Sequence, residues 1–190
     1  MFGKKKRLFT EAAVAIENTF RPHFVMTEYL DKGEFNPPSG FYRDPYILSF
    51  VVNLANFFRV SLLKGKNWSD AKKGDYIIFI LNYLDKDMKD NIVADFGQFL
   101  IENRFHPETV RGSDDAGSLF GAMFGLLPED DDNIIVVEAR KLADDFQTNI
   151  EQTNQLIGEP NVGKNVGLMA AIDHLTIKKH IHENYLNEHG

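Results

Sequence analysis

The chain has 190 residues and no cysteine, which excludes disulfides, thiolate metal sites and a thiol nucleophile. Hydrophobic residues make up 43% and charged residues 26%, a composition typical of a globular chain. The net charge of −7 disfavours general binding to nucleic acids or anionic membranes, because both depend on positive surface.

The length predicts one helical domain over residues 1–190 that can bury a substantial core. Sixteen phenylalanines, with six tyrosines and one tryptophan, predict that this core is rich in aromatic rings. The absence of cysteine is compatible with a reducing compartment, and we expect a cytoplasmic protein.

The N-terminal third contains one helix and one loop. Residues 1–7 include a basic run at residues 4–7 and are predicted to form a flexible tail. Apolar side chains with helical spacing then predict a helix that Pro22 ends or kinks near Phe20. Residues 33–42, which contain two glycines and two adjacent prolines, are predicted to form a loop.

Two strongly apolar runs follow. Residues 45–63 keep a period of 3.6 and are long enough to cross a membrane, but Asn53, Asn56 and Arg59 interrupt them. We therefore expect a core helix from which Arg59 reaches the surface. Residues 76–84 are compatible with a buried strand or a buried helix, and their spacing favours a helix.

The next segments alternate between helix and turn. Apolar residues between Ile92 and Leu100 predict a helix, and residues 111–117 are predicted to be a loop. Small residues then recur every four positions, at Gly117, Gly121 and Gly125, and again from Gly163. This spacing favours close packing within the molecule. A contact in a membrane or oligomer, or a helix weakened into a loop, remains an alternative.

The C-terminal third is predicted to contain the longest helix. An acidic turn at residues 129–132 precedes residues 133–157, whose apolar positions alternate spacings of four and three. Apolar residues from Leu168 to Tyr185 predict a final helix. The sequence therefore predicts an all-α fold, a single-domain bundle of six or seven helices with a phenylalanine-rich core.

One segment approaches a phosphate-binding motif. Gly158, Gly163 and Lys164 have the spacing of a P-loop, but Asn165 stands where a serine or threonine hydroxyl is needed. The preceding residues have helical rather than strand character. We therefore favour a helix that ends at Gly158 and a turn into the next helix, and we predict no cofactor.

Candidate metal ligands are not spaced for chelation. Four of the six histidines lie between residues 174 and 189, but none is three or four positions from another, so we interpret them as solvated surface residues. Adjacent carboxylates such as Asp144 and Asp145 are typical of solvated surface, and residues 130–138 lack the glycine and the glutamate of a calcium loop. We predict no metal.

The sequence supports three functional hypotheses. The favoured one is a soluble, non-enzymatic protein-interaction module that binds a protein partner or itself. The second is a carrier or sensor of an apolar small molecule held between helices. The third is an enzyme whose catalytic groups converge only in the folded chain. No catalytic residue is predicted, and neither nucleic acid nor stable membrane insertion is expected.

Overall fold

The computed structural model describes residues 2–25, 27–85, 97–98, 101–158, 163 and 165–186. About three quarters of the chain is helical, and the part that is described contains seven α-helices and one hairpin of two short strands. Eight phenylalanines among the described residues are buried. The prediction of an all-α fold with six or seven helices and a phenylalanine-rich core is therefore confirmed.

The chain divides into two compact units, residues 1–114 and residues 115–190. The boundary falls within helix α5, which spans Pro107–Phe124. Each unit is described by itself below. The single-domain organisation over residues 1–190 stays a prediction.

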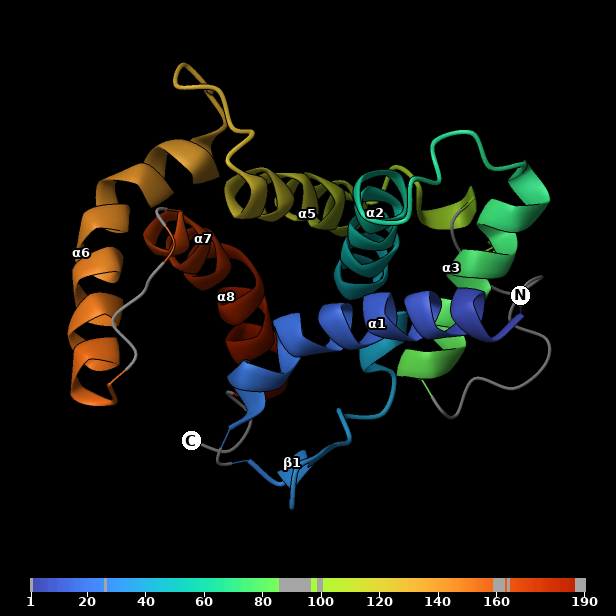
Figure 1. Ribbon diagram of the computed structural model, residues 1–190, viewed down its shortest axis with the longest axis horizontal. Helices are drawn as coiled ribbons and strands as arrows, with labels where there is room; N and C mark the ends of the chain where they lie inside the picture. The colour runs from blue at the N-terminus through green and yellow to red at the C-terminus, as the bar shows by residue number, and fades with distance from the viewer. Residues whose placement is uncertain are drawn as a thin grey trace. The chain divides into compact units, whose positions relative to one another are not determined.

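Helix α1 of the first unit spans Phe2–Phe20, so it includes most of the segment predicted to be a flexible tail (Figure 1). It ends where the proline was expected to end it, because Pro22 lacks the N–H that would continue the ladder. The 3₁₀ helix η1, Arg21–Phe24, follows directly.

The predicted loop at residues 33–42 contains regular structure. Strands β1, Leu30–Asp31, and β2, Glu34–Phe35, form an antiparallel hairpin in which Asp31 pairs with Glu34. The two turn residues, Lys32 and Gly33, both have positive φ, +47° and +83°, which is the pattern of a type I′ turn. The 3₁₀ helix η2, Phe41–Arg43, closes the segment.

The two apolar runs are both helices. Helix α2, Pro45–Ser61, begins at the N-cap Asp44, whose carboxylate accepts hydrogen bonds from the amides of Tyr46 and Ile47 at 2.8 and 3.0 Å. Helix α3, Asp70–Leu84, begins after the N-cap Ser69. The helical interpretation of residues 76–84 is therefore confirmed, and no described helix is long and apolar enough to span a membrane.

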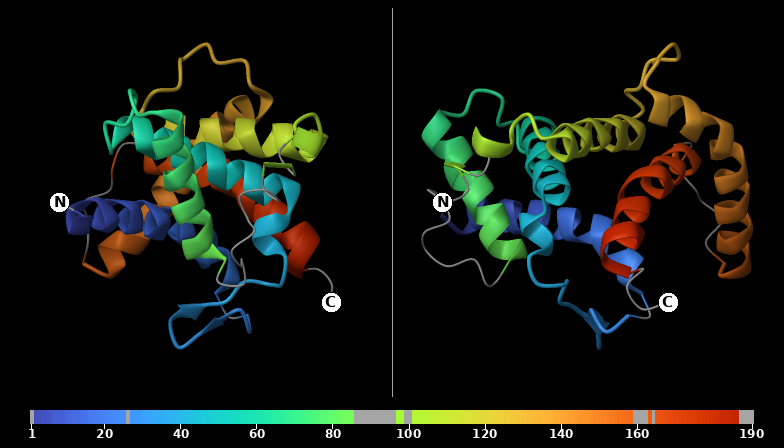
Figure 2. Two further views of the ribbon diagram at one scale, coloured as in Figure 1. Left: turned by 90° about the vertical axis from the view of Figure 1, so that its right-hand side faces the viewer. Right: turned by 180° about the vertical axis from the view of Figure 1, so that it is seen from behind.

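Helices α1, α2 and α3 pack on one another in the first unit (Figures 1 and 2). Aromatic rings pack against one another between these helices and their neighbours. The Phe20 ring lies 5.4 Å from that of Phe41 and 5.8 Å from that of Phe50. Phe24 lies 5.2 Å from Phe35. Most of these pairs meet edge to face, which the ring quadrupole favours.

Helix α5 contradicts one prediction. Residues 111–117, predicted to be a loop, are helical within it. A β-carbon on Gly112 would lie 2.3 Å from the carbonyl oxygen of Tyr46, so glycine at this position allows α5 to approach α2. Most of the helix predicted around residues 92–100 lies outside the described residues.

The second unit contains α6, Ile134–Leu156, and a continuous helical run over residues 166–186. That run comprises α7, Val166–Asp173, the π-helical stretch η3, His174–Lys178, α8, Lys179–Ile181, and the π-helical stretch η4, His182–Leu186. Figures 1 and 2 show α6 and α7 side by side. The long helix predicted at residues 133–157 is thus confirmed.

Small residues make close contacts inside this unit. A β-carbon on Gly167 would lie 2.3 Å from the carbonyl oxygen of Ala143, and one on Gly121 would lie 2.5 Å from Leu127. The Gly167 amide also donates to the side-chain oxygen of Gln147 at 2.8 Å. Close packing within the molecule is therefore the role of both glycines.

Candidate functional site

The P-loop-like segment begins at a helix end. Gly158 has a φ of +79°, and its amide donates to the carbonyl oxygen of Gln155 at 3.3 Å, which is how a glycine terminates a helix. A β-carbon on Gly163 would lie 3.5 Å from Val166, and Lys164 lies outside the described residues. Helix α6 precedes the segment where a P-loop requires a strand.

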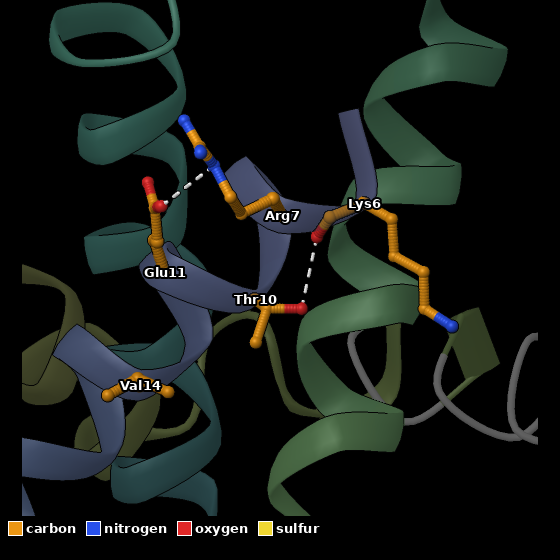
Figure 3. Close-up of a pocket in the computed structure, with 5 residues that line it drawn as sticks. All are labelled: Lys6, Arg7, Thr10, Glu11 and Val14. Atoms are coloured by element: carbon orange, nitrogen blue, oxygen red, sulfur yellow. Dashed lines mark hydrogen bonds and ion pairs between the residues drawn. The ribbon is translucent and has the colours of Figure 1, made fainter. Parts of the chain in front are cut away.

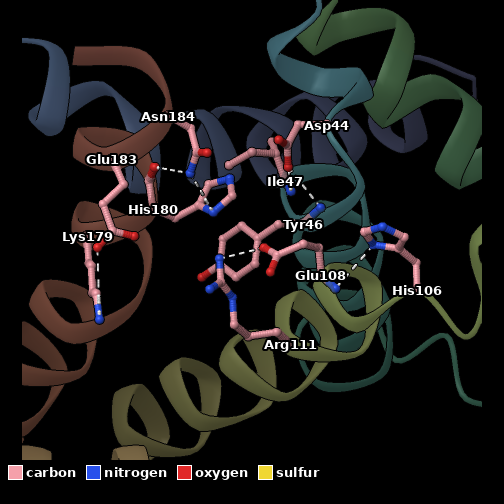
Figure 4. Close-up of polar contacts among 10 residues, drawn as sticks. All are labelled: Asp44, Tyr46, Ile47, His106, Glu108, Arg111, Lys179, His180, Glu183 and Asn184. Atoms are coloured by element: carbon pink, nitrogen blue, oxygen red, sulfur yellow. Dashed lines mark hydrogen bonds and ion pairs between the residues drawn. The ribbon is translucent and has the colours of Figure 1, made fainter. Parts of the chain in front are cut away.

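One histidine differs from its prediction. His180 is buried, although the sequence suggested a solvated surface residue, and its Nδ1 lies 3.3 Å from Nδ2 of Asn184 (Figure 4). The π-helical stretch η3 explains the difference, because a wider turn rotates the following residues around the helix axis. His174 and His182 are exposed as predicted, and His189 lies outside the described residues.

The described residues contain no group of three or more acidic or histidine side chains arranged to hold a metal ion.

The connection between α5 and α6 is a loop that carries four consecutive acidic residues, 129–132 (Figure 1). Glu129, Asp130 and Asp132 are exposed at its centre. The guanidinium of Arg140, on α6, donates to the carbonyl oxygens of Pro128 and, at 2.9 Å, of Glu129. Because backbone oxygens accept these bonds, Arg140 holds the loop in shape without using the carboxylates.

Large apolar side chains precede and follow this acidic turn. Leu126 is 64% exposed and Ile134 is 69% exposed. Phe124, at the end of α5, and Val137, one helical turn after Ile134, are also exposed. Apolar residues therefore flank an acidic turn whose backbone is held by Arg140. We call this mixed surface the α5–α6 loop surface and define it as residues 124–137.

The net negative charge of the chain comes from the unit that carries this surface. Residues 115–190 contain 13 acidic and five basic residues, whereas residues 1–114 contain 15 acidic and 16 basic residues. The second unit is therefore strongly negative and the first is close to neutral. A negative field of this kind attracts positively charged partners over distances comparable with the Debye length, about 8 Å at physiological salt.

A shallow hollow of about 510 Å³ lies on α1 (Figure 3). It is lined by Lys6, Arg7, Thr10, Glu11 and Val14. Arg7 is paired with Glu11 at 3.3 Å, and both side chains are well exposed. A solvated pair one helical turn apart contributes about 0.3–0.5 kcal/mol, so this hollow is an ordinary helix surface.

A second hollow, of about 460 Å³, lies under the residues that connect β2 to α2. We call it the arch pocket and define it by its lining, residues 35–43 with Leu84 and Asp85 at the end of α3. Burial raises the pKa of the adjacent Tyr42 above its ordinary value, and the carboxylates of Glu17 and Asp85 raise it further. The phenol is therefore neutral across the physiological range.

The contact of α5 with α2 carries a polar cluster within the first unit (Figure 4). Arg111 pairs with Glu108 at 2.6 Å, and its guanidinium lies 4.7 Å from the ring centroid of Tyr46. The buried hydroxyl of Ser49 donates to the carbonyl oxygen of Thr109 at 2.6 Å. These contacts hold α5 against α2, and none of their residues lines either hollow.

Comparisons with known proteins identify no relative. No protein-family model matches the chain, and neither a curated protein nor a solved structure matches it.

Sequence reasoning found part of these features. The acidic turn was predicted as a turn, but its exposed apolar flanks and its support by Arg140 were not. The arch pocket was missed because its lining comes from residues some 40 positions apart. The adjacent prolines at 37–38, next to three aromatic residues, were the available signal.

Proposed function

We propose that the protein is a non-enzymatic interaction module that binds a basic, amphipathic segment of another protein through the α5–α6 loop surface. One observation carries the proposal: exposed apolar side chains flank a fixed acidic turn in the unit that holds the excess negative charge. A cytoplasmic location belongs to the same proposal.

The chemistry of the surface favours this partner over an uncharged one. A purely apolar partner would cover the carboxylates of Glu129, Asp130 and Asp132 without compensating their charge, and the lost hydration would oppose binding. Lysine or arginine side chains compensate that charge, while an apolar face covers Leu126 and Ile134. A helix with a basic face and an apolar face meets both requirements.

The fixed shape of the loop supports the proposal further. Ordering a mobile loop upon binding costs free energy, which reduces affinity. Arg140 and the N-cap Asn133, whose amide donates to the carboxylate of Asp131 at 3.0 Å, already order this loop. The free-energy cost of ordering upon binding therefore falls mainly on the partner segment.

The proposal is tested by fluorescence anisotropy with a labelled helical peptide that carries lysines on one face and leucines on the other. The variant D130N/D132N should weaken binding about five-fold, because each lost charge contributes about 0.5 kcal/mol at an exposed site. L126S/I134S should weaken it at least ten-fold. The affinity of the unaltered protein should fall as salt rises.

A matched control is D144N/D145N, which removes the same charge from exposed positions on α6. It should leave the peptide affinity within two-fold of the unaltered protein. Equal weakening by both double variants would reduce the effect to general electrostatics and refute a defined surface. Light scattering tests the alternative that a second copy of this chain binds the surface. A dimer that L126S/I134S abolishes would identify the second copy as the partner and overturn the proposed basic segment.

A further inference from the structure

The arch pocket is built on a stiff backbone. Pro37 and Pro38 have fixed φ angles and no N–H group. The amide of Phe41 donates to the carbonyl oxygen of Pro38 at 3.0 Å, and that of Arg43 donates to Gly40 at 2.8 Å. Gly40 has a φ of +80°, which favours glycine at this position. The hollow is therefore formed before any ligand enters.

Among the described residues, the lining combines an apolar wall with one charge of each sign. Phe35, Phe41 and Leu84 are buried apolar residues. Arg43 and Asp85 contribute the charges, and Nε of Arg43 lies 3.6 Å from Oδ2 of Asp85. This separation exceeds the roughly 2.7–2.9 Å of a charge-assisted hydrogen bond. The two side chains are therefore close enough to balance their charges without a short charge-assisted hydrogen bond between these two atoms.

The two side chains differ in their access to water. The side chain of Asp85 is 14% exposed, whereas that of Arg43 is 60% exposed. A cation that enters the pocket therefore meets a carboxylate largely shielded from water, where an ionic contact is stronger than at the surface. An anion meets the more exposed guanidinium of Arg43, and this group has five N–H donors.

These charges discriminate between classes of ligand. A ligand with a single charge would be attracted by one of Arg43 and Asp85 and repelled by the other. An uncharged apolar ligand would cover the ion pair and remove its hydration without replacing it. A zwitterion matches both charges, and an apolar group attached to it covers the wall.

We propose that the arch pocket binds a free amino acid with an apolar side chain. Its carboxylate pairs with Arg43, its ammonium group pairs with Asp85, and its side chain lies against Phe35, Phe41 and Leu84. The volume of about 460 Å³ falls within the roughly 300–1,000 Å³ of small-molecule sites. This site is formed entirely within the first unit and is independent of the proposed protein partner.

Titration calorimetry on the full chain tests the charge requirement without altering the protein. L-phenylalanine and L-leucine should bind saturably with a Kd below about 1 mM, equivalent to about 4 kcal/mol of binding free energy. N-acetyl-phenylalanine lacks the ammonium group and phenylalanine amide lacks the carboxylate, so each should bind at least ten-fold more weakly. No saturable binding of either amino acid at 10 mM, or equal binding of all four compounds, would overturn the proposal.

Two variants then assign the charges. R43Q should weaken phenylalanine binding at least ten-fold but should not weaken the binding of phenylalanine amide, because Arg43 repels that cation. D85N should likewise weaken phenylalanine binding at least ten-fold but should not weaken the binding of N-acetyl-phenylalanine, which Asp85 repels. The matched control R7Q alters an exposed, ion-paired arginine on α1 and should bind phenylalanine normally. Helical circular dichroism establishes that each variant is folded. A folded R43Q that binds phenylalanine normally would refute the assignment.

Discussion

Replacing Gly112 by alanine should destabilise the first unit, because the new methyl group would collide with backbone. It would lie 2.3 Å from the carbonyl oxygen of Tyr46 and 3.1 Å from its carbonyl carbon. Ordinary contact requires at least 3.4 Å, so α5 must move about 1.1 Å away from α2. The 2.6 Å hydrogen bond from Ser49 to Thr109 joins the same two helices and would lengthen with that movement.

The magnitude follows from two destabilising terms and one stabilising term. Overpacking of this kind costs about 1–3 kcal/mol, and the lost hydrogen bond adds about 1 kcal/mol. The higher helix propensity of alanine returns about 1 kcal/mol. We therefore expect G112A to lower the free energy of unfolding by about 1–3 kcal/mol, measured by urea denaturation with helical circular dichroism and the fluorescence of Trp68.

Gly74, on α3, provides the matched control. It also lies within a helix, but a β-carbon there would have no neighbour within 4 Å. G74A should therefore raise the free energy of unfolding by about 0.5–1 kcal/mol. If G112A proved as stable as the unaltered protein, or if both variants shifted stability in the same direction, the inferred close approach of α5 to α2 would be refuted.

Four further changes have defined outcomes. The hydroxyl of Thr109 is buried and has no hydrogen-bond partner among the described residues, so T109V should raise the free energy of unfolding. S49A removes a buried donor and should lower the free energy of unfolding by about 1 kcal/mol in the same urea assay. Lys32 precedes Gly33 in the turn with positive φ, so K32N should raise the melting temperature, because asparagine suits that turn better. Because folding raises the pKa of Tyr42, the contribution of this phenol to the free energy of unfolding is fully present below pH 10 and is lost as the pH rises further. Y42F should therefore reduce the alkaline loss of stability by up to about 1.4 kcal/mol per pH unit. A loss between pH 9 and 11 that is the same with and without Y42F would contradict the raised pKa.

Periodicity predicted the helices correctly where side chains of one kind recur on one face. Helix α2 was predicted from its apolar spacing, and the proline that follows α1 was expected to end it. The run at residues 76–84 was harder, because continuous apolar residues suit either a strand or a helix. Ser69 settles the question in the structure by accepting a hydrogen bond from the amide of Lys72 at the start of α3.

The predictions for residues 111–117 and for His180 were wrong for physical reasons that the spacing of residues does not reveal. The loop predicted at residues 111–117 is helical, and Gly112 within it permits a contact with Tyr46 that alanine would prevent. His180 was interpreted as a surface residue because its spacing from the other histidines does not suit chelation, whereas it is buried just after the π-helical stretch η3. Each depends on contacts between residues that are distant in sequence, or on a departure from regular geometry.

The two candidate sites differ in how far the sequence could have revealed them. The α5–α6 loop surface is continuous in the chain, so its acidic and apolar residues can be read from 14 consecutive positions, although exposure and the bonds of Arg140 come only from the structure. The arch pocket needs Arg43 and Asp85 to meet, and nothing local in either segment requires that they do. A surface made from one loop can also change by local substitution, whereas the pocket depends on α3 ending beside η2. Alterations that shift the end of α3 should therefore abolish amino-acid binding while leaving peptide binding to the loop intact.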